Sequence, residues 1–214
     1  MPTAIPINDQ PIEATFFGEG KWLTEFVTPN ALEVKRLHGK LTDGIDEIGD
    51  RVLACWQWVA NQVRYVRFVQ ARIEVNGHVS AQEDYWANPS LTIRTKVGNC
   101  ANKAFLLCSL LRNELPPERV SAVLGNLNQG GEVGGHAWCE VSLNSHSSIL
   151  EATRGDMRPM VATDVADMYE PVIYFNDKSL SAIEGRTVLT PFAEVFCDWL
   201  RDYLDWAYIE GRKG

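Results

Sequence analysis

Cys100 is the residue in this chain whose surroundings best suit nucleophilic chemistry. It follows Gly98-Asn99 and directly precedes more than three turns of helix-favouring residues, so it lies at the predicted start of a helix. A helix amino terminus presents unpaired N–H groups and the positive end of the macrodipole, which favour a thiolate and can receive an oxyanion. The alternative role for Cys100 is that of a small apolar residue packed in a buried turn.

A thiolate nucleophile needs a general base, and the chain has four histidines that could supply one. His136 opens a predicted strand after a glycine-rich loop, where the backbone can approach a neighbour closely. We predict surface positions for His38, in an exposed helix, His78, after an Asn-Gly turn, and His146, in a polar turn. His136 is therefore the candidate base, and a strand-end histidine without chemistry is the alternative.

Glu151 is the candidate for the third group, which would hold the imidazole. It lies in the apolar segment "SILEAT" (148–153), where a buried carboxylate is costly unless it is paired. If residues 136–143 and 148–153 form a hairpin, Glu151 comes opposite or beside His136. The competing carboxylate, Glu140, is about 13 Å from His136 along an extended strand. We therefore prefer Glu151.

Hydrophobic periodicity predicts the elements that would position these residues. Residues 101–112 are apolar around most of the helix circumference, which indicates a central helix that ends before Pro116-Pro117. The spacing predicts further helices at about 30–41, 46–64 and 191–210, and strands at 119–127, 136–143, 148–153 and 171–175. This order indicates an α+β fold in which the central helix packs on an antiparallel sheet and the helices at 46–64 and 191–210 cover it.

Four other segments are predicted to form loops or cleft walls. The segment "QEDYWANPSLTIRTKVGN" (82–99) is expected to be the loop that leads to Cys100. The segment "NQGGEVGG" (128–135) is either a mobile lid or a plain hairpin turn. Residues 1–27 and 156–190 are expected to form walls of the cleft.

Three segments, taken in order, resemble the transglutaminase-like superfamily of cysteine enzymes: "VGNCANKAFLLCSLLR" (97–112), "GGHAWCEV" (134–141) and "ILEAT" (149–153). The resemblance covers about residues 31–155 and implies a papain-like, transglutaminase-like core. It also implies that Cys100 is the nucleophile, His136 the base and acid, and Glu151 the orienting carboxylate. The sequence departs from the family pattern at Asn99 and at Glu151, because Asp is usual before the cysteine and common at the third position.

Further site candidates surround this triad. The backbone N–H of Cys100 is a candidate oxyanion donor, and the indole of Trp86 is another, although core packing explains Trp86 equally well. Asn99 directly precedes Cys100, and Trp138 comes two residues after His136. Both are candidates for the oxyanion site or the cleft. Cys108 and Cys139 are interpreted as core residues.

The resemblance implies acyl transfer from protein or peptide amide bonds through a thioester on Cys100. Many microbial members are thought to be hydrolases, so a peptidase or amidase is the favoured hypothesis. A transglutaminase, which uses an amine acceptor, is the first alternative. A non-catalytic peptide-binding or assembly module is the second, and a papain-like acyltransferase with a small thioester cofactor is the third.

The composition limits the partners and the cellular location that the protein is expected to have. The 214-residue chain has a net charge of -8 and a pI near 5.0, which argues against nucleic acid as a partner. We expect one domain over residues 1–214, with a protein or peptide as the partner and with no membrane, cofactor or metal. Five cysteines without paired spacing, and no signal-peptide pattern, predict a reducing, cytoplasmic location. The sequence indicates no oligomeric state.

Overall fold

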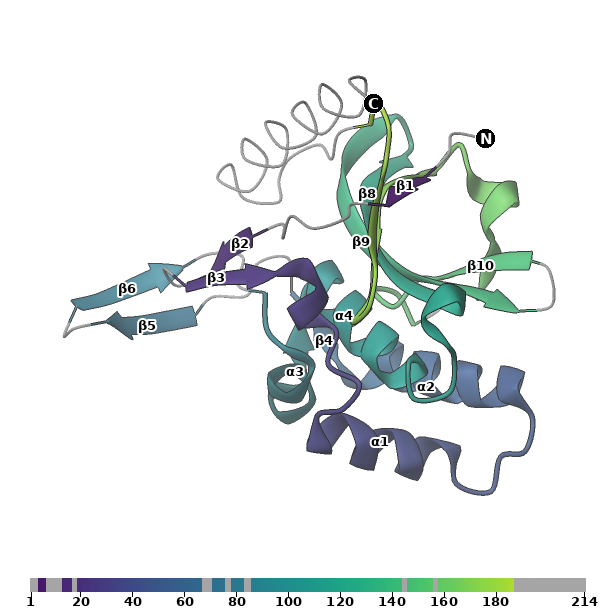
Figure 1. Cartoon of the computed structure of the whole chain (residues 1–214), viewed down its shortest axis with the longest axis horizontal. Helices are drawn as coiled ribbons and strands as arrows, with labels where there is room; N and C mark the ends of the chain where they lie inside the picture. The colour runs from purple at the N-terminus through teal and green to yellow at the C-terminus, as the bar shows by residue number, and fades with distance from the viewer. Residues whose placement is uncertain are drawn as a thin grey trace.

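A single antiparallel sheet and a central helix form the core of the protein (Figure 1). The structure, a computed structural model, describes residues 4–6, 13–16, 19–66, 71–75, 78–82, 86–143, 146–155 and 158–186. The predicted helix at 191–210 lies outside these residues. Within them, the sheet has seven strands in the order β1 (Ala4–Pro6), β13 (Leu180–Ile183), β12 (Tyr169–Phe175), β8 (Val120–Gln129), β9 (Glu132–Leu143), β10 (His146–Leu150) and β11 (Met160–Val161).

Helix α4 (Cys100–Leu111) is the central helix that the sequence predicts, and all twelve of its residues are buried. It packs against β8 and β9 on one side and against the other helices on the opposite side, as Figure 1 shows. These are α1 (Leu32–Thr42), α2 (Ile48–Gln62) and α3 (Pro89–Thr95). The α+β class and the helices predicted at 30–41 and 46–64 are confirmed. No helix among the described residues is long and apolar enough to cross a bilayer.

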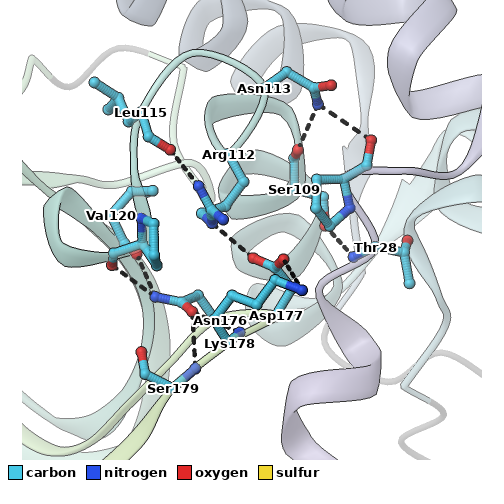
Figure 2. Close-up of polar contacts among 12 residues, drawn as sticks. Thr28, Ser109, Arg112, Asn113, Leu115, Val120, Asn176, Asp177, Lys178 and Ser179 are labelled. Carbon is cyan, nitrogen blue, oxygen red and sulfur yellow. Dashed lines mark hydrogen bonds and ion pairs between the residues drawn. The ribbon is translucent and has the colours of Figure 1, made fainter.

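A polar network holds the carboxyl end of α4 (Figure 2). The guanidinium of Arg112 donates to Asp177 over 2.6 Å, and both side chains are largely buried. The side-chain amide of Asn176 donates to the carbonyl oxygens of Pro117 and Val120 at 2.8 and 3.0 Å. These contacts tie the carboxyl end of the helix to the turn between β12 and β13.

The segment 82–99, predicted as a loop, contains α3 and β7 (Val97–Gly98). Asn88 caps α3 because its side-chain oxygen accepts the N–H of Leu91 at 3.0 Å, and Pro89 occupies the first helical turn, where its missing N–H costs nothing. Strand β7 then pairs in parallel with β4 (Arg64–Tyr65). The approach to Cys100 is thus regular structure anchored to the end of α2.

The glycine-rich segment 128–135 forms part of a long β-hairpin. Strands β8 and β9 extend through it and pair up to Gln129 and Glu132. Only Gly130 and Gly131 form the turn, with φ values of +65° and +89°. A two-residue turn of this kind requires positive φ at both positions, which glycine adopts without strain. This geometry agrees with the hairpin turn that the sequence offered as one alternative.

The predicted strands are confirmed, with shifted boundaries. Residues 169–175 and 180–183 form β12 and β13 of the main sheet, so this part of 156–190 belongs to the core rather than to a cleft wall. Two hairpins project beside it, as Figure 1 shows: β2 (Glu13–Phe16) with β3 (Glu19–Trp22), and β5 (Ala71–Val75) with β6 (His78–Gln82). Short 3₁₀ turns complete the described elements: η1 (Leu23–Phe26), η2 (Pro117–Arg119) and η3 (Ala162–Val165).

Candidate functional site

The structure brings His136 and Glu151 into direct contact. Nε2 of His136 lies 2.7 Å from Oε2 of Glu151, and the two residues are only 9% and 2% exposed. The register of the β9–β10 hairpin pairs Leu150 with Cys139, so the next residue along comes beside Trp138 and diagonal to His136. The predicted hairpin therefore produces the predicted contact.

Cys100 completes this arrangement from the other side of the imidazole. It is the first residue of α4 and is 8% exposed, and its thiol lies within hydrogen-bonding reach of His136. Because Nε2 of His136 is hydrogen-bonded to Glu151, Nδ1 is the ring nitrogen that can face the sulfur of Cys100. Helix α4, strand β9 and the segment after β10 thus place Cys100, His136 and Glu151, respectively, next to one another.

Asn99 acts as the cap of α4. Its side-chain oxygen accepts the backbone N–H of Asn102 at 3.0 Å, and the residue is 1% exposed. Asn102 in turn accepts the N–H of Ala87 at 2.8 Å, which ties the start of the helix to the preceding segment. Asn and Asp are equivalent at such a position, so this departure from the family pattern leaves the helix start intact.

Four donors surround the buried carboxylate of Glu151. Oε1 accepts the backbone N–H and the hydroxyl of Thr153 at 2.8 and 2.6 Å, and Oε2 accepts the hydroxyl of Tyr169 at 3.1 Å as well as the imidazole of His136. The backbone carbonyl of Glu151 accepts the indole N–H of Trp56 at 2.8 Å. These contacts compensate for the burial of the charge.

Sequence reasoning missed these supporting residues for different reasons. Thr153 lies two residues after Glu151, a spacing at which side chains bond to nearby backbone, so a local signal was present. Tyr169 and Trp56 come from β12 and α2, and nothing near them in the sequence points to Glu151. Their contacts depend on the packing of distant elements.

The electrostatics of the pair favour an imidazolium and a carboxylate. Burial alone would raise the pKa of Glu151, but the charge of His136 and the hydrogen bonds from His136 and Thr153 lower it to about 2. Burial alone would lower the pKa of His136, but Glu151 and Cys100 raise it to about 10. Both groups are therefore charged at neutral pH.

The chain matches a known protein family over much of its length. The sequence profile described as the Transglutaminase-like superfamily matches residues 35–148, more than half of the chain. The chain belongs to the transglutaminase-like superfamily. The resemblance found in the sequence is confirmed, and the matched region holds Cys100 and His136, while Glu151 lies three residues beyond its end.

Solved structures show the same transglutaminase-like fold. LapG of Legionella pneumophila has a TM-score of 0.51 and is 16% identical, with 85% of this chain and 95% of LapG covered. The EGTA-treated form of LapG gives a TM-score of 0.50 and 15% identity over the same shares of the two chains. At such low identity the likeness concerns the fold alone. A search of curated protein sequences finds no match.

A buried lysine lies one turn along α4 from the candidate nucleophile of this transglutaminase-like site. Lys103 is 1% exposed, and its ammonium donates to the carbonyl oxygens of Ala60 and Val63 at 3.2 and 2.7 Å. Burial lowers the pKa of Lys103 to about 8, although the charge of Glu151 acts in the opposite direction. Lys103 therefore joins the carboxyl end of α2 to the amino end of α4.

The tryptophans proposed for the cleft lie in aromatic clusters. The ring of Trp138 stacks on His136 with centroids 6.2 Å apart and meets Tyr169 edge-on at 5.2 Å. The ring of Trp86 packs edge-on against Phe26 and Phe105 at 5.7 and 5.2 Å. Trp138 thus supports one face of the imidazole, while Trp86 packs in the core.

The predicted positions of two of the three remaining histidines can be compared with the structure, whereas the side chain of His78 lies outside the described part of the chain. His146 is exposed, whereas His38 is largely buried, with Nε2 2.9 Å from a carboxylate oxygen of Glu114, so its predicted surface position is wrong. Cys108 and Cys139 are fully buried in the core, as expected. Among the described residues, no group of three or more His, Cys, Asp or Glu side chains could hold a metal ion.

Proposed function

We propose that this protein is a cysteine-dependent enzyme that cleaves protein or peptide amide bonds through a thioester on Cys100. The supporting observation is the buried His136–Glu151 pair, with 2.7 Å between Nε2 and Oε2, whose imidazole also contacts Cys100 at the start of α4. A thiol, an imidazole and an orienting carboxylate in this order are the groups that thiol acyl transfer needs. Hydrolysis, as in a peptidase or amidase, is the outcome that we favour.

In this mechanism the sulfur of Cys100 attacks the carbonyl carbon of the amide and forms a tetrahedral oxyanion. The C–N bond then breaks, and the imidazolium of His136 gives its proton to the leaving amine. Water attacks the resulting thioester while neutral His136 takes the water proton, and the C–S bond breaks to release the acid and restore the thiolate–imidazolium pair. Throughout, Glu151 holds the imidazole and stabilises its charged form.

The start of α4 is the candidate oxyanion site. Asn99 is the acceptor for two of the first backbone N–H groups of the helix. Its side-chain oxygen accepts a hydrogen bond from the N–H of Asn102, and its carbonyl oxygen accepts one from the N–H of Lys103 at 3.1 Å. The N–H of Cys100 comes before these two and lies next to the attacking sulfur, so we propose it as the backbone donor to the oxyanion.

The rate of iodoacetamide modification of Cys100, followed by peptide mass spectrometry, tests the nucleophile. We expect rapid modification at pH 7 in the wild type and at least tenfold slower modification in His136→Ala, because the imidazolium stabilises the thiolate. Exposure alone would also favour Cys100, which is 8% exposed, over Cys108 and Cys139, which are fully buried. The comparison with His136→Ala separates activation from exposure, and equal rates in the two proteins would refute the proposal.

A second assay separates the outcomes of acyl transfer. The protein is incubated with casein and a fluorescent primary amine, with Cys100→Ser as the control. New peptide amino termini that depend on Cys100 would support a peptidase, whereas incorporation of the amine would show a transglutaminase. If Cys100 is reactive but neither product forms, and casein peptides bind to the protein unchanged, the non-catalytic binding module becomes the better explanation.

A further inference from the structure

Tyr169 contacts the same carboxylate oxygen that holds the imidazole. Its hydroxyl donates to Oε2 of Glu151 at 3.1 Å, and this oxygen also lies 2.7 Å from Nε2 of His136. Tyr169 is 3% exposed. Burial, together with the charge of Glu151 and this hydrogen bond, raises the pKa of Tyr169 above its usual range, so the phenol remains a neutral donor.

The ring of Tyr169 has packing contacts that do not involve its hydroxyl. The ring packs edge-on against Trp138 at 5.2 Å, and its centroid lies 6.3 Å from that of His136. Tyr169 begins β12 opposite Leu127 of β8, ahead of an irregularity in the pairing between Pro171 and Ile173. A phenylalanine ring would therefore fill the same space, and only the hydrogen bond would be lost.

Glu151 has a particular need for such a contact. A glutamate side chain has one more rotatable bond than aspartate, so its carboxylate needs more support to stay in one orientation. Thr153 holds Oε1 with two hydrogen bonds, and Tyr169 holds Oε2. Both ends of the carboxylate are thus fixed, and Oε2 points at the imidazole.

We propose that Tyr169 is a positioning residue of the site: its hydroxyl holds Oε2 of Glu151 against the imidazole of His136. This inference rests on the proposed function, because it assigns Tyr169 a part in activating Cys100. Without the hydroxyl, the carboxylate can turn away from Nε2, the imidazolium loses part of its stabilisation, and His136 activates Cys100 less effectively.

Tyr174 provides a matched control on the same strand. Its hydroxyl hydrogen-bonds to Glu140, a carboxylate that also accepts the hydroxyl of Ser147 at 2.5 Å and lies outside the site. Tyr174→Phe therefore removes the same chemical group, from the same strand, with the loss of the same kind of bond. Only Tyr169→Phe removes a contact to Glu151.

The experiment compares the wild type, Tyr169→Phe, Tyr174→Phe and His136→Ala. We expect Cys100 to react with iodoacetamide at pH 7 about tenfold more slowly in Tyr169→Phe, which is the effect of losing one hydrogen bond to a charged group. In Tyr174→Phe we expect a rate within about twofold of the wild type, as for a bond outside the site. Urea unfolding should show comparable losses of stability in the two tyrosine variants, so a general structural effect would slow both equally.

Proton NMR adds a measurement that a general loss of stability would not change. The Nε2 proton of His136, hydrogen-bonded over 2.7 Å, should resonate far downfield in the wild type. We expect this signal to move upfield or broaden in Tyr169→Phe and to stay in place in Tyr174→Phe.

The two hypotheses fail in different ways. If His136→Ala is slow but Tyr169→Phe matches the wild type in rate and in the imidazole signal, the proposed function stands and Tyr169 has only a packing role. If Tyr169→Phe and Tyr174→Phe are slowed equally, the positioning role is also refuted. If His136→Ala reacts as fast as the wild type, the nucleophile proposal fails and the role of Tyr169 fails with it.

Discussion

The indole N–H of Trp56 donates a hydrogen bond of 2.8 Å to the backbone carbonyl of Glu151. Trp56 belongs to α2, on the helical side of the molecule, whereas Glu151 directly follows β10 of the sheet. The contact is buried, since Trp56 is 5% exposed and Glu151 is 2% exposed. It fixes the backbone of the candidate triad carboxylate relative to α2, which packs against the helix that carries Cys100.

We predict that Trp56→Phe lowers the free energy of unfolding by about 1–3 kcal/mol, because the buried carbonyl of Glu151 loses its donor. The modification of Cys100 by iodoacetamide should also slow, because the backbone that carries the carboxylate is released. Trp58→Phe, on the same helix but only partly buried at the edge of the core, is the control. Equal rates of modification in both variants would show that Trp56 contributes to stability alone.

Glu151→Gln should destabilise the protein most between pH 4.5 and 6.5. In the wild type, the pKa of Glu151 falls from 4.5 to about 2, so its contribution to stability is full above pH 4.5 and is lost as the pH falls toward 2. The pKa of His136 rises from 6.5 to about 10, so its contribution is full below pH 6.5 and is lost as the pH rises through 10. Urea unfolding of both proteins from pH 3 to 9 measures the difference, and a difference independent of pH would contradict the charged pair.

Glu151→Asp should impair the site, even though aspartate is common at the corresponding position of the transglutaminase-like family pattern. The shorter side chain cannot contact His136, Thr153 and Tyr169 together, because the backbone of Glu151 is held by Trp56. We expect the modification of Cys100 to slow about tenfold, the effect of one lost charged hydrogen bond. A rate equal to that of the wild type would mean that the length of this side chain is not important.

Asn99→Ala should lower the free energy of unfolding by about 1 kcal/mol, because α4 loses its cap at Asn102 N–H. Asn99→Asp should be close to neutral, because an aspartate oxygen accepts the same N–H. Denaturant unfolding of the two variants measures the contrast. Equal destabilisation by both would show that the amide group of Asn99 has a role other than capping.

Gly125→Ala should disturb both stability and the site. A Cβ at position 125 would lie 2.2 Å from the carbonyl oxygen of Glu170 and 2.5 Å from the ring of Trp138, and position 125 pairs directly with His136. Such crowding costs about 1–3 kcal/mol or more, and we expect Cys100 to react more slowly because Trp138 must shift against the imidazole. Gly134→Ala, where a Cβ meets nothing within 4 Å, is the matched control and should be nearly neutral in both measurements.

Much of the core could be predicted from the sequence because its signals are local. The apolar residues around most of the circumference of residues 101–112 predict a helix buried on nearly every side, and α4 is buried throughout. The hairpin between 136–143 and 148–153 predicts the neighbourhood of His136 and Glu151, because strand pairing converts sequence spacing into position. The predictions failed at α3, where a side-chain cap starts a helix, and at His38, which is largely buried against the carboxylate of Glu114.

The sequence by itself determined the order of Cys100, His136 and Glu151 and the elements that carry them. Only the tertiary structure decided how Glu151 is held, because its donors Trp56 and Tyr169 come from α2 and β12. These contacts arise when non-adjacent elements pack, and a buried carboxylate must find donors wherever that packing supplies them. For the same reason, the sequence does not explain the buried Lys103 in the apolar α4. Its hydrogen-bond acceptors, the carbonyl oxygens at the end of α2, become its neighbours only when the two helices pack.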